Sequence, residues 1–260
     1  MSSSATARLG AVEPKLAFDH VTRRYNGVSA VDSLSLQIDK GSFVALVGTS
    51  GSGKSSLLRL VNRLDRPDHG KVLIDGCDVA TIDPIALRRS VGYVFQNIGL
   101  FPHMSVAENI RIIPRLAGGS AVDVGAALEQ VELPAAYADR FPAQLSGGEQ
   151  QRVGTARALA GEGKLLLMDE PFGALDPVTR DRLGNTVLAL HEQLGLTTIL
   201  VTHDMAEALL LADRVVVMAQ GRIVADATPR EMIAGLAGPG ADALVAIPRQ
   251  QAERLGRLAQ

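Results

Sequence analysis

The stretch GTSGSGKS, from Gly48 to Ser55, decides the fold of this chain. The apolar run Phe43 to Val47 leads into it and predicts a buried strand, and apolar positions at helical spacing follow it from Leu57 to Leu64. Strand, glycine-rich loop and helix are the context that the phosphate-binding pattern G-x-x-x-x-G-K-[ST] requires. Glycines let backbone N–H groups curl around an anion, and the helix N-terminus adds its positive dipole end. The stretch therefore predicts a nucleotide-phosphate site rather than a simple connecting turn.

Two side chains of this loop have specific expected tasks. Lys54 is expected to reach the β- and γ-phosphates, and Ser55 is expected to place its hydroxyl on Mg²⁺. The residues expected to surround the nucleotide phosphates are Gly48, Thr49, Ser50, Gly51, Ser52, Gly53, Lys54, Ser55 and Ser56.

The composition limits the class of protein. The 260 residues are 47% hydrophobic, which is enough for one large core or for a core with a small subdomain. The net charge of −2 shows no basic excess, which argues against a nucleic-acid partner. The single cysteine, Cys77, excludes an internal disulfide and is expected to be a buried structural thiol. No run approaches the roughly 18 apolar residues of a spanning helix, and no secretory signal opens the chain, so a membrane role would need a partner.

Hydrophobic periodicity predicts an α/β chain interrupted by a helical region. Strands are expected over residues 16–21, 34–38, 91–95, 165–168, 198–201 and 215–218, with a hairpin over 72–79 that turns at Asp75-Gly76. Residues 104–160 change to helical character. A long helix is expected from Asp176-Pro177 to Gly195, and another begins at Thr228. Residues 1–14 read as a disordered arm, and the tail over 236–260 as either a helix or a frayed segment.

A second chemical motif is LLLMDEP, Leu165 to Pro171, an apolar strand that ends in two carboxylates. Asp169 stands where phosphate-loop NTPases hold the Mg²⁺ shell. Glu170 is a candidate general base for an attacking water. Two solvated acids after a strand are weak evidence alone, but with the glycine-rich loop earlier in the chain they predict nucleotide hydrolysis.

A third motif is LSGGEQQR, Leu145 to Arg152, which puts Ser146, Gly147 and Gly148 at the start of a helix. Such a helix start is a second anion-binding element. The chain thus has two phosphate-binding elements but one loop able to hold Mg²⁺. The economical arrangement is two chains that share each nucleotide.

Together, in this order, these motifs resemble the nucleotide-binding subunit of an ABC transporter, over about residues 16–235. The resemblance implies a phosphate-loop NTPase core of the ABC-ATPase type, with an antiparallel β region and an inserted helical subdomain over about 104–160, in a domain that spans 15–235. It implies that Tyr25 stacks on adenine, that Gln96 contacts Mg²⁺, and that His203 senses the γ-phosphate. The loop Ala174–Asp176 would cross to the opposite site.

The implied machinery falls into three groups. Catalysis is expected from Lys54, Glu170 and His203. The Mg²⁺ ligands are expected among Ser55, Gln96 and Asp169. The contacts to ATP from the partner chain are expected from Ser146, Gly147, Gly148, Glu149 and Asp176.

The resemblance also implies partners. They are a second ATPase subunit forming a homodimer or pseudo-dimer, integral-membrane permease subunits, and indirectly a substrate-binding protein, with the chain peripheral at the cytoplasmic face of the plasma membrane. The permease is expected to dock along Asn97 to Glu108, where Ile98, Leu100, Phe101 and Met104 form an apolar cluster; a core role for Phe101 is an equal alternative. About 25 residues follow the last predicted helix, so a regulatory CBS domain is not expected within this sequence.

The segments Phe95 to Ile110 and Met168 to Arg180 resemble importers of quaternary amines such as glycine betaine, choline or carnitine. Importers of amino acids or sugars share part of this wording and remain an alternative. A soluble ABC ATPase of DNA repair or translation, and a phosphate-loop kinase or regulator, are further alternatives. A soluble ABC ATPase of DNA repair or translation usually carries a coiled-coil insertion or a second cassette. A phosphate-loop kinase or regulator would not need LSGGEQ.

Overall fold

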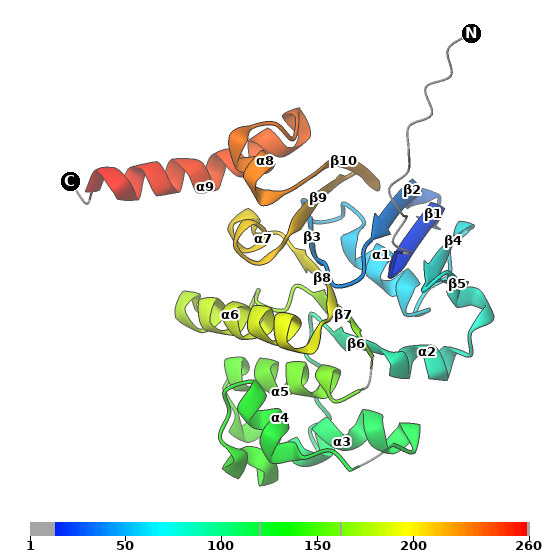
Figure 1. The fold of residues 1–260 in the computed structure, drawn as a ribbon, viewed down its shortest axis with the longest axis vertical. Helices are drawn as coiled ribbons and strands as arrows, with labels where there is room; N and C mark the ends of the chain where they lie inside the picture. The colour runs from blue at the N-terminus through cyan, green and yellow to red at the C-terminus, as the bar shows by residue number, and fades with distance from the viewer. Residues whose placement is uncertain (1–13, 120, 162, 259–260) are drawn as a thin grey trace.

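The protein is built on two β-sheets (Figure 1). The computed structural model describes residues 14–119, 121–161 and 163–258, so the arm predicted over 1–14 lies outside the described residues except for Pro14. An antiparallel sheet has the order β2-β1-β4-β5, and a six-stranded sheet has the order β10-β9-β3-β8-β7-β6. The strands are β1 (Leu16–Tyr25), β2 (Val28–Ile38), β3 (Phe43–Val47), β4 (His69–Ile74), β5 (Cys77–Asp78), β6 (Val91–Val94), β7 (Leu165–Asp169), β8 (Thr197–Thr202), β9 (Arg214–Ala219) and β10 (Arg222–Ala227).

Some of the helices cover the six-stranded sheet, and others form a separate layer that lies below it in Figure 1. They are α1 (Lys54–Val61), α2 (Pro84–Ser90), α3 (Val106–Ala117), α4 (Val124–Gln130), α5 (Gly147–Leu159), α6 (Pro177–Leu194), α7 (Met205–Leu211), α8 (Pro229–Ala234) and α9 (Pro239–Leu258). None of these helices, within the described ranges, has the length and hydropathy needed to cross a membrane.

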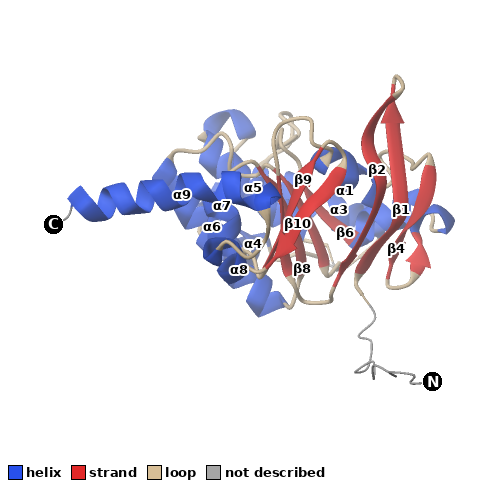
Figure 2. Ribbon diagram, turned by 90° about the horizontal axis from the view of Figure 1, so that it is seen from above, coloured by secondary structure: helices blue, strands red, loops and turns tan. Residues whose placement is uncertain are grey.

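Strand β3 divides the main core in two because its side chains alternate between the faces of the sheet. Val44 and Leu46 face a core that includes α1 and the antiparallel sheet. Phe43, Ala45 and Val47 face a second core, which α6, α7, α8 and the start of α9 complete. Figure 2 shows the antiparallel sheet on one side of the six-stranded sheet and these helices on the other. β3 is therefore buried on both faces, and the loop that follows it has a rigid base.

Helices α3, α4 and α5 have a core of their own, which includes Ile110, Leu128 and Val153. Helix α3 begins with a capping box, in which Ser105 accepts from the Glu108 backbone N–H and Glu108 accepts from the Ser105 backbone N–H. This layer corresponds to the helical region predicted over residues 104–160.

Three sequence-based expectations differ from the structure at particular residues. Cys77 is exposed, not buried, because β5 is a two-residue strand at the edge of its sheet. Leu64 lies beyond the end of α1, which stops at Val61, and is partly exposed. The strand predicted over 16–21 continues to Tyr25, since β2 pairs with its whole length.

Three short elements were not anticipated from the sequence. Helix α2 is capped by Asp83 and begins at Pro84, the same Asp-Pro arrangement that starts α6. Helix α7 is capped by Asp204. Strand β10 pairs antiparallel with β9. The tail, which the sequence left open between helix and frayed chain, is the helix α9 over most of its length and projects from the body (Figure 1).

Candidate nucleotide site

The backbone of the loop between β3 and α1 makes a tight turn. Gly53 has φ of 103° and caps α1, and a Cβ placed there would lie 2.0 Å from the carbonyl oxygen of Ala30. No residue other than glycine fits this position, because both the left-handed backbone and the neighbouring carbonyl exclude a side chain. Thr49 and Ser50 are exposed, whereas Ser52 and Gly53 are buried. The loop therefore presents its tip to solvent while its base is fixed in the core.

Lys54, the first residue of α1, is only 4% exposed. Its ammonium donates to the carbonyl oxygens of Gly48 and Thr49 at 2.8 and 3.0 Å. Burial lowers the pKa of Lys54, while the negative charges of Glu170 and Asp169 oppose this shift. A cation is thus held inside the loop, close to two carboxylates from another strand.

Strand order explains how residues far apart in sequence meet around this loop. β3 lies beside β8, β8 beside β7, and β7 beside β6, and all these pairs are parallel. Their carboxyl ends therefore share one edge of the sheet, the usual ligand-binding edge of an open α/β sheet. That edge carries the phosphate loop after β3, His203 after β8, Glu170 after β7 and Gln96 after β6.

Asp169 ends β7 with its carboxylate directed at the start of α1. Its Oδ1 accepts a hydrogen bond from the Ser55 hydroxyl at 2.8 Å. Burial raises the pKa of the Asp169 carboxyl, and the Ser55 bond works in the opposite direction. Tyr93, a buried residue of β6, has its pKa raised by burial and by the nearby Asp169 charge. Tyr93 could not be predicted as part of the site, because nothing in its spacing along the chain links it to the Asp169 carboxylate.

Glu170 occupies a strained position immediately after the strand. Its φ is 46°, in the left-handed region that residues with a Cβ seldom adopt. Backbone strain of this kind costs about 1–3 kcal/mol, and it persists only where the surrounding structure holds the residue in that conformation. The carboxylate accepts from the Gln96 amide at 3.3 Å and lies 3.4 Å from Nδ1 of His203. The structure thus brings together Gln96, Glu170 and His203, which the sequence placed in three separate segments.

Behind His203 lies a polar cluster that sequence reasoning missed. Thr202 donates to Glu207 at 2.6 Å and accepts from the backbone N–H of Asp204 at 3.0 Å. Arg180, on α6, lies 3.5 Å from both Asp204 and Glu207 and donates to the carbonyl of Leu175 at 3.2 Å. The turn that carries His203 is therefore fixed from behind, by residues of α6 and α7 that no local pattern connects.

Tyr25 ends β1 with its ring partly exposed. Its hydroxyl donates to Asp65, and the guanidinium of Arg23 lies 4.6 Å from the ring centroid. Arg23 also pairs with Asp65 at 2.7 Å. Two side chains thus hold the ring in place, and the described hydrogen bonds do not link it to the phosphate loop.

Ser146, Gly147, Gly148 and Glu149 of the LSGGEQQR motif, called the signature residues below, form a second group of predicted site residues. Ser146 caps α5 in a reciprocal box with Glu149, and Asp176 caps α6. A hollow of about 450 Å³ is lined by residues 146–149 and 174–176. A Cβ on Gly148 would lie 2.8 Å from the Thr179 methyl, so the two helix starts pack closely. Among the described residues, no side-chain hydrogen bond or ion pair joins residues 146–149 to residues 48–56.

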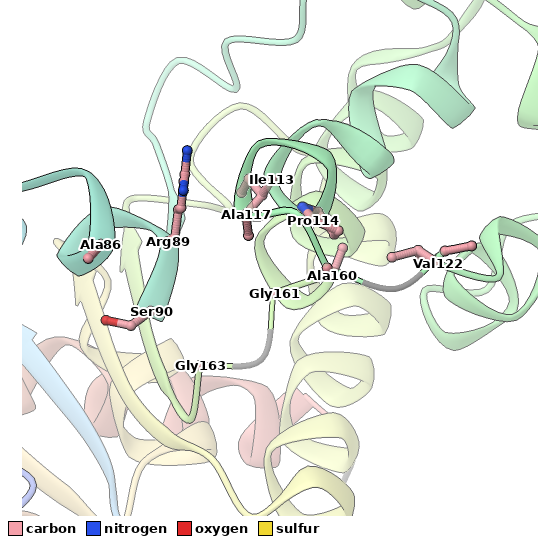
Figure 3. Close-up of a pocket in the computed structure, with 12 residues that line it drawn as sticks. Ala86, Arg89, Ser90, Ile113, Pro114, Ala117, Val122, Ala160, Gly161 and Gly163 are labelled. Carbon is pink, nitrogen blue, oxygen red and sulfur yellow. The ribbon is translucent and has the colours of Figure 1, made fainter.

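Another hollow, of about 440 Å³, lies outside both groups (Figure 3). Arg89 and Ser90 of α2 form one side, and Ile113 and Pro114 of α3 form the other. It marks the place where the sheet-based part of the chain meets the helical layer.

Gly53→Ala is expected to abolish nucleotide binding and to lower the free energy of unfolding by more than the ~1–2 kcal/mol of left-handed strain alone. The reason is the Ala30 carbonyl, which leaves no room for a Cβ. Gly51→Ala is the matched control, because Gly51 also has positive φ, 79°, but open space around it. Urea denaturation and binding of a fluorescent ATP analogue would measure both variants. An equal loss in the free energy of unfolding of the two variants would contradict the steric argument.

Comparisons with known proteins agree with this geometry. The family model described as ABC transporter matches residues 31–173. The chain is 50% identical over 223 residues to the carnitine transport ATP-binding protein OpuCA of Listeria monocytogenes, covering 84% of this chain and 56% of that protein. It is 45% identical over 222 residues to the glycine betaine uptake system ATP-binding protein YehX of Escherichia coli, covering 84% of this chain and 72% of that protein. The chain thus spans little more than half of the first relative's length.

Among solved structures, the chain is similar to the ATP-binding cassette MJ0796, in a dimeric, post-hydrolysis state bound to ADP and Pi. The TM-score is 0.75 at 33% identity, and the match covers 83% of this chain and 99% of that one. The two-sheet core with an inserted helical layer is therefore the fold of an ABC cassette, as the sequence predicted. The matched family model and the relatives lead to one conclusion: the chain belongs to the ABC transporter family.

Proposed function

We propose that this chain is the ATP-hydrolysing subunit of an ABC importer for a quaternary-amine osmoprotectant. One observation carries the proposal. The parallel strands β3, β7 and β8 bring Lys54, Asp169, Glu170 and His203 to one edge of the sheet, around a glycine-rich loop.

The oxygen atoms beside the loop fit a Mg²⁺ ion. The Ser55 hydroxyl and the Asp169 carboxylate lie 2.8 Å apart, and Gln96 follows β6 at the same edge of the sheet. Hydroxyl, carboxylate and amide oxygens are the ligands that this hard cation prefers, together with water and substrate phosphates. When bound, Mg²⁺ would neutralise part of the phosphate charge; Ser55, Asp169 and Gln96 are the residues proposed to hold it.

The proposed reaction is phosphoryl transfer from ATP to water. Lys54 and the backbone N–H groups of the loop stabilise the charge that develops on the phosphate oxygens. Glu170 accepts the proton of the attacking water, with Gln96 and His203 holding its carboxylate in place. Tyr25, held by Arg23 and Asp65, offers its ring to the adenine.

The complete site is proposed to need two chains. Ser146, Gly147, Gly148 and Glu149 would close over the nucleotide bound to the partner chain, and Asp176 would lie beside them. Support comes from the described hydrogen bonds and ion pairs, none of which joins these side chains to the phosphate loop of the same chain. The dimeric state of the similar cassette MJ0796 also supports it.

The choice of solute rests on the relatives. The names of OpuCA and YehX refer to carnitine transport and glycine betaine uptake. We infer a related quaternary amine here, carried through separate permease subunits, with this chain at the cytoplasmic face of the membrane. A substrate-binding protein would deliver the solute.

The experiment that tests this function is uptake by cells that lack the gene. Uptake of labelled glycine betaine, carnitine or choline is expected to be lost in the deletion strain, and uptake of a labelled amino acid or of maltose is expected to be unchanged. The wild-type gene should restore the lost uptake. Loss of amino-acid or sugar uptake instead would move the assignment to the alternative importers, and no loss of any uptake would contradict a transport role.

Phe101→Asp is expected to abolish restored uptake while leaving the ATPase activity of the isolated chain within about twofold. The reason is that Phe101 is 40% exposed on the segment proposed to receive the permease, which sets aside the alternative of a core role. Leu100 would be a poorer choice, since it packs against the core of the helical layer. Normal uptake with Phe101→Asp at normal expression would show that the docking surface lies elsewhere.

A further inference from the structure

The segment from Asn97 to Ser105 has no regular secondary structure, yet two buried polar side chains fix its backbone. Asn109, on α3, is fully buried and donates to the carbonyls of Phe101, Met104 and Ser105 at 3.0–3.1 Å. It also accepts from the Phe101 N–H at 2.8 Å. The second half of the segment is therefore anchored to the helical layer.

The first half of the segment is anchored to α5 by Arg157. This side chain is 7% exposed, and its guanidinium donates to the carbonyls of Gly99 and Ile98 at 2.7 and 2.6 Å. Both are short, charge-assisted bonds, and a planar guanidinium is able to make them simultaneously. Burial lowers the pKa of Arg157.

Helix α5 also touches the segment directly. A Cβ on Gly154 would lie 2.8 Å from a methyl group of Ile98, so the helix and the segment approach closely at this glycine. Ser146 caps the same helix at its other end. A helix of this length is a rod of about 20 Å. It therefore connects the signature residues at one end with the Ile98 and Gly99 carbonyls at the other.

The geometry points to Arg157 as a positioning residue that makes the segment 97–105 move with α5. This inference rests on the proposed function, in which the signature residues close over ATP on the partner chain. When Ser146 moves towards that nucleotide, α5 would carry the segment 97–105 with it. Phe101, which is proposed to contact the permease, would then move relative to the two sheets. Arg157 would transmit the closure without touching ATP.

The test measures the distance between two spin labels by double electron–electron resonance, in the full-length Glu170→Gln chain. One label sits on Cys77, the exposed native cysteine of the antiparallel sheet, and the other on His103→Cys in the segment. Dilution with unlabelled Cys77→Ser chains limits the signal to distances within one chain. Size-exclusion chromatography with and without ATP reports dimer formation on the same samples.

ATP is expected to shift the distance in the Arg157 parent, and Arg157→Gln is expected to lose the shift while still forming the ATP-dependent dimer. Arg152→Gln is the matched control. Arg152 lies on the same helix and is also 7% exposed, but its guanidinium binds the carbonyl of Val131 and the side chain of Glu132. It should keep the full shift. Arg157→Lys keeps the charge but lacks the planar, two-pronged guanidinium that matches both carbonyls, so it should keep less than half of the shift.

Several outcomes would overturn the inference. A full shift in Arg157→Gln, or in Arg157→Lys if the glutamine variant does not fold, would show that the segment does not depend on the guanidinium. Equal loss in the Arg152 control would show general loosening of α5. A dimer without any shift in the parent would rule out the movement itself, with the proposed function intact, whereas absence of an ATP-dependent dimer would contradict the proposed function as well.

Discussion

Glu170→Gln is expected to lower ATP turnover by about 10²–10⁴-fold, the contribution typical of a general base. Glutamine keeps the shape of the side chain and can still bond to Gln96, but it does not accept a proton from water. ATP should then stay bound, and the chain should accumulate as a nucleotide-held dimer. The left-handed backbone of Glu170 is unchanged by this substitution, since both residues meet the same steric limits. A single-turnover ATPase assay with size-exclusion chromatography would measure both effects.

A second substitution in that background tests whether the site is shared. Ser146→Arg places a bulky side chain at the start of α5, where the partner's nucleotide is proposed to lie. It should abolish ATP-dependent dimerisation while leaving ATP binding through residues 48–55 largely intact. ATP favours a closed dimer only through contacts that it makes across the interface. Equal dimerisation of the single and double variants would show that the signature does not act across that interface.

Mixed dimers give the control for this experiment. A Lys54→Ala chain paired with a Ser146→Arg chain retains one intact site, formed by the loop of the second chain and the signature of the first. Two chains that each carry both substitutions retain none. Nucleotide retention by the mixed pair, and not by the doubly substituted pair, is the expected result.

Lys54→Ala is expected to weaken ATP binding about 10- to 100-fold, since a hydrogen bond to a charged group is worth about 1.5–3 kcal/mol. Hydrolysis should fall with it, because the same ammonium stabilises charge on the phosphate oxygens during the reaction. Thermal unfolding with and without ATP would measure the binding, since a ligand that binds only the folded chain raises its stability.

Lys164→Ala serves as the control for Lys54→Ala. Lys164 is exposed and donates to the carbonyl of Leu194 at the end of α6, far in the chain from the glycine-rich loop. It should keep the wild-type response to ATP. Wild-type activity of Lys54→Ala, at both low and saturating ATP, would refute the assignment of the loop.

Contiguous patterns allowed much of this protein to be predicted from its sequence. The loop Gly48–Ser55 needs only its own glycines, the strand before it and the helix after it. The hairpin at Asp75-Gly76 and the capped starts of α3, α6 and α8 are likewise local. The family resemblance then named Tyr25, Gln96 and His203, and the comparisons confirmed the family and the fold.

Exposure could not be predicted in the same way, because it depends on what other elements cover a residue. Cysteine is a residue type common in protein cores, but Cys77 lies on an edge strand. Leu64 continues the apolar spacing of a helix, but α1 ends at Val61. Phe101 was ambiguous for the same reason, since only the packing of the helical layer shows that Leu100 lies against its core and that Phe101 is exposed.

By itself, the sequence determined the elements that are proposed to bind phosphate and the residue types that are proposed to act in hydrolysis, because these depend on short-range backbone geometry and on chemistry. Only the tertiary structure decided which of them meet. The order of the parallel strands places Glu170 between Gln96 and His203, and no described side-chain hydrogen bond or ion pair joins residues 146–149 to the phosphate loop of the same chain. Arg157, and Arg180 in the cluster behind His203, belong to this second class, because their partners are backbone carbonyls and side chains of distant segments that no sequence pattern marks.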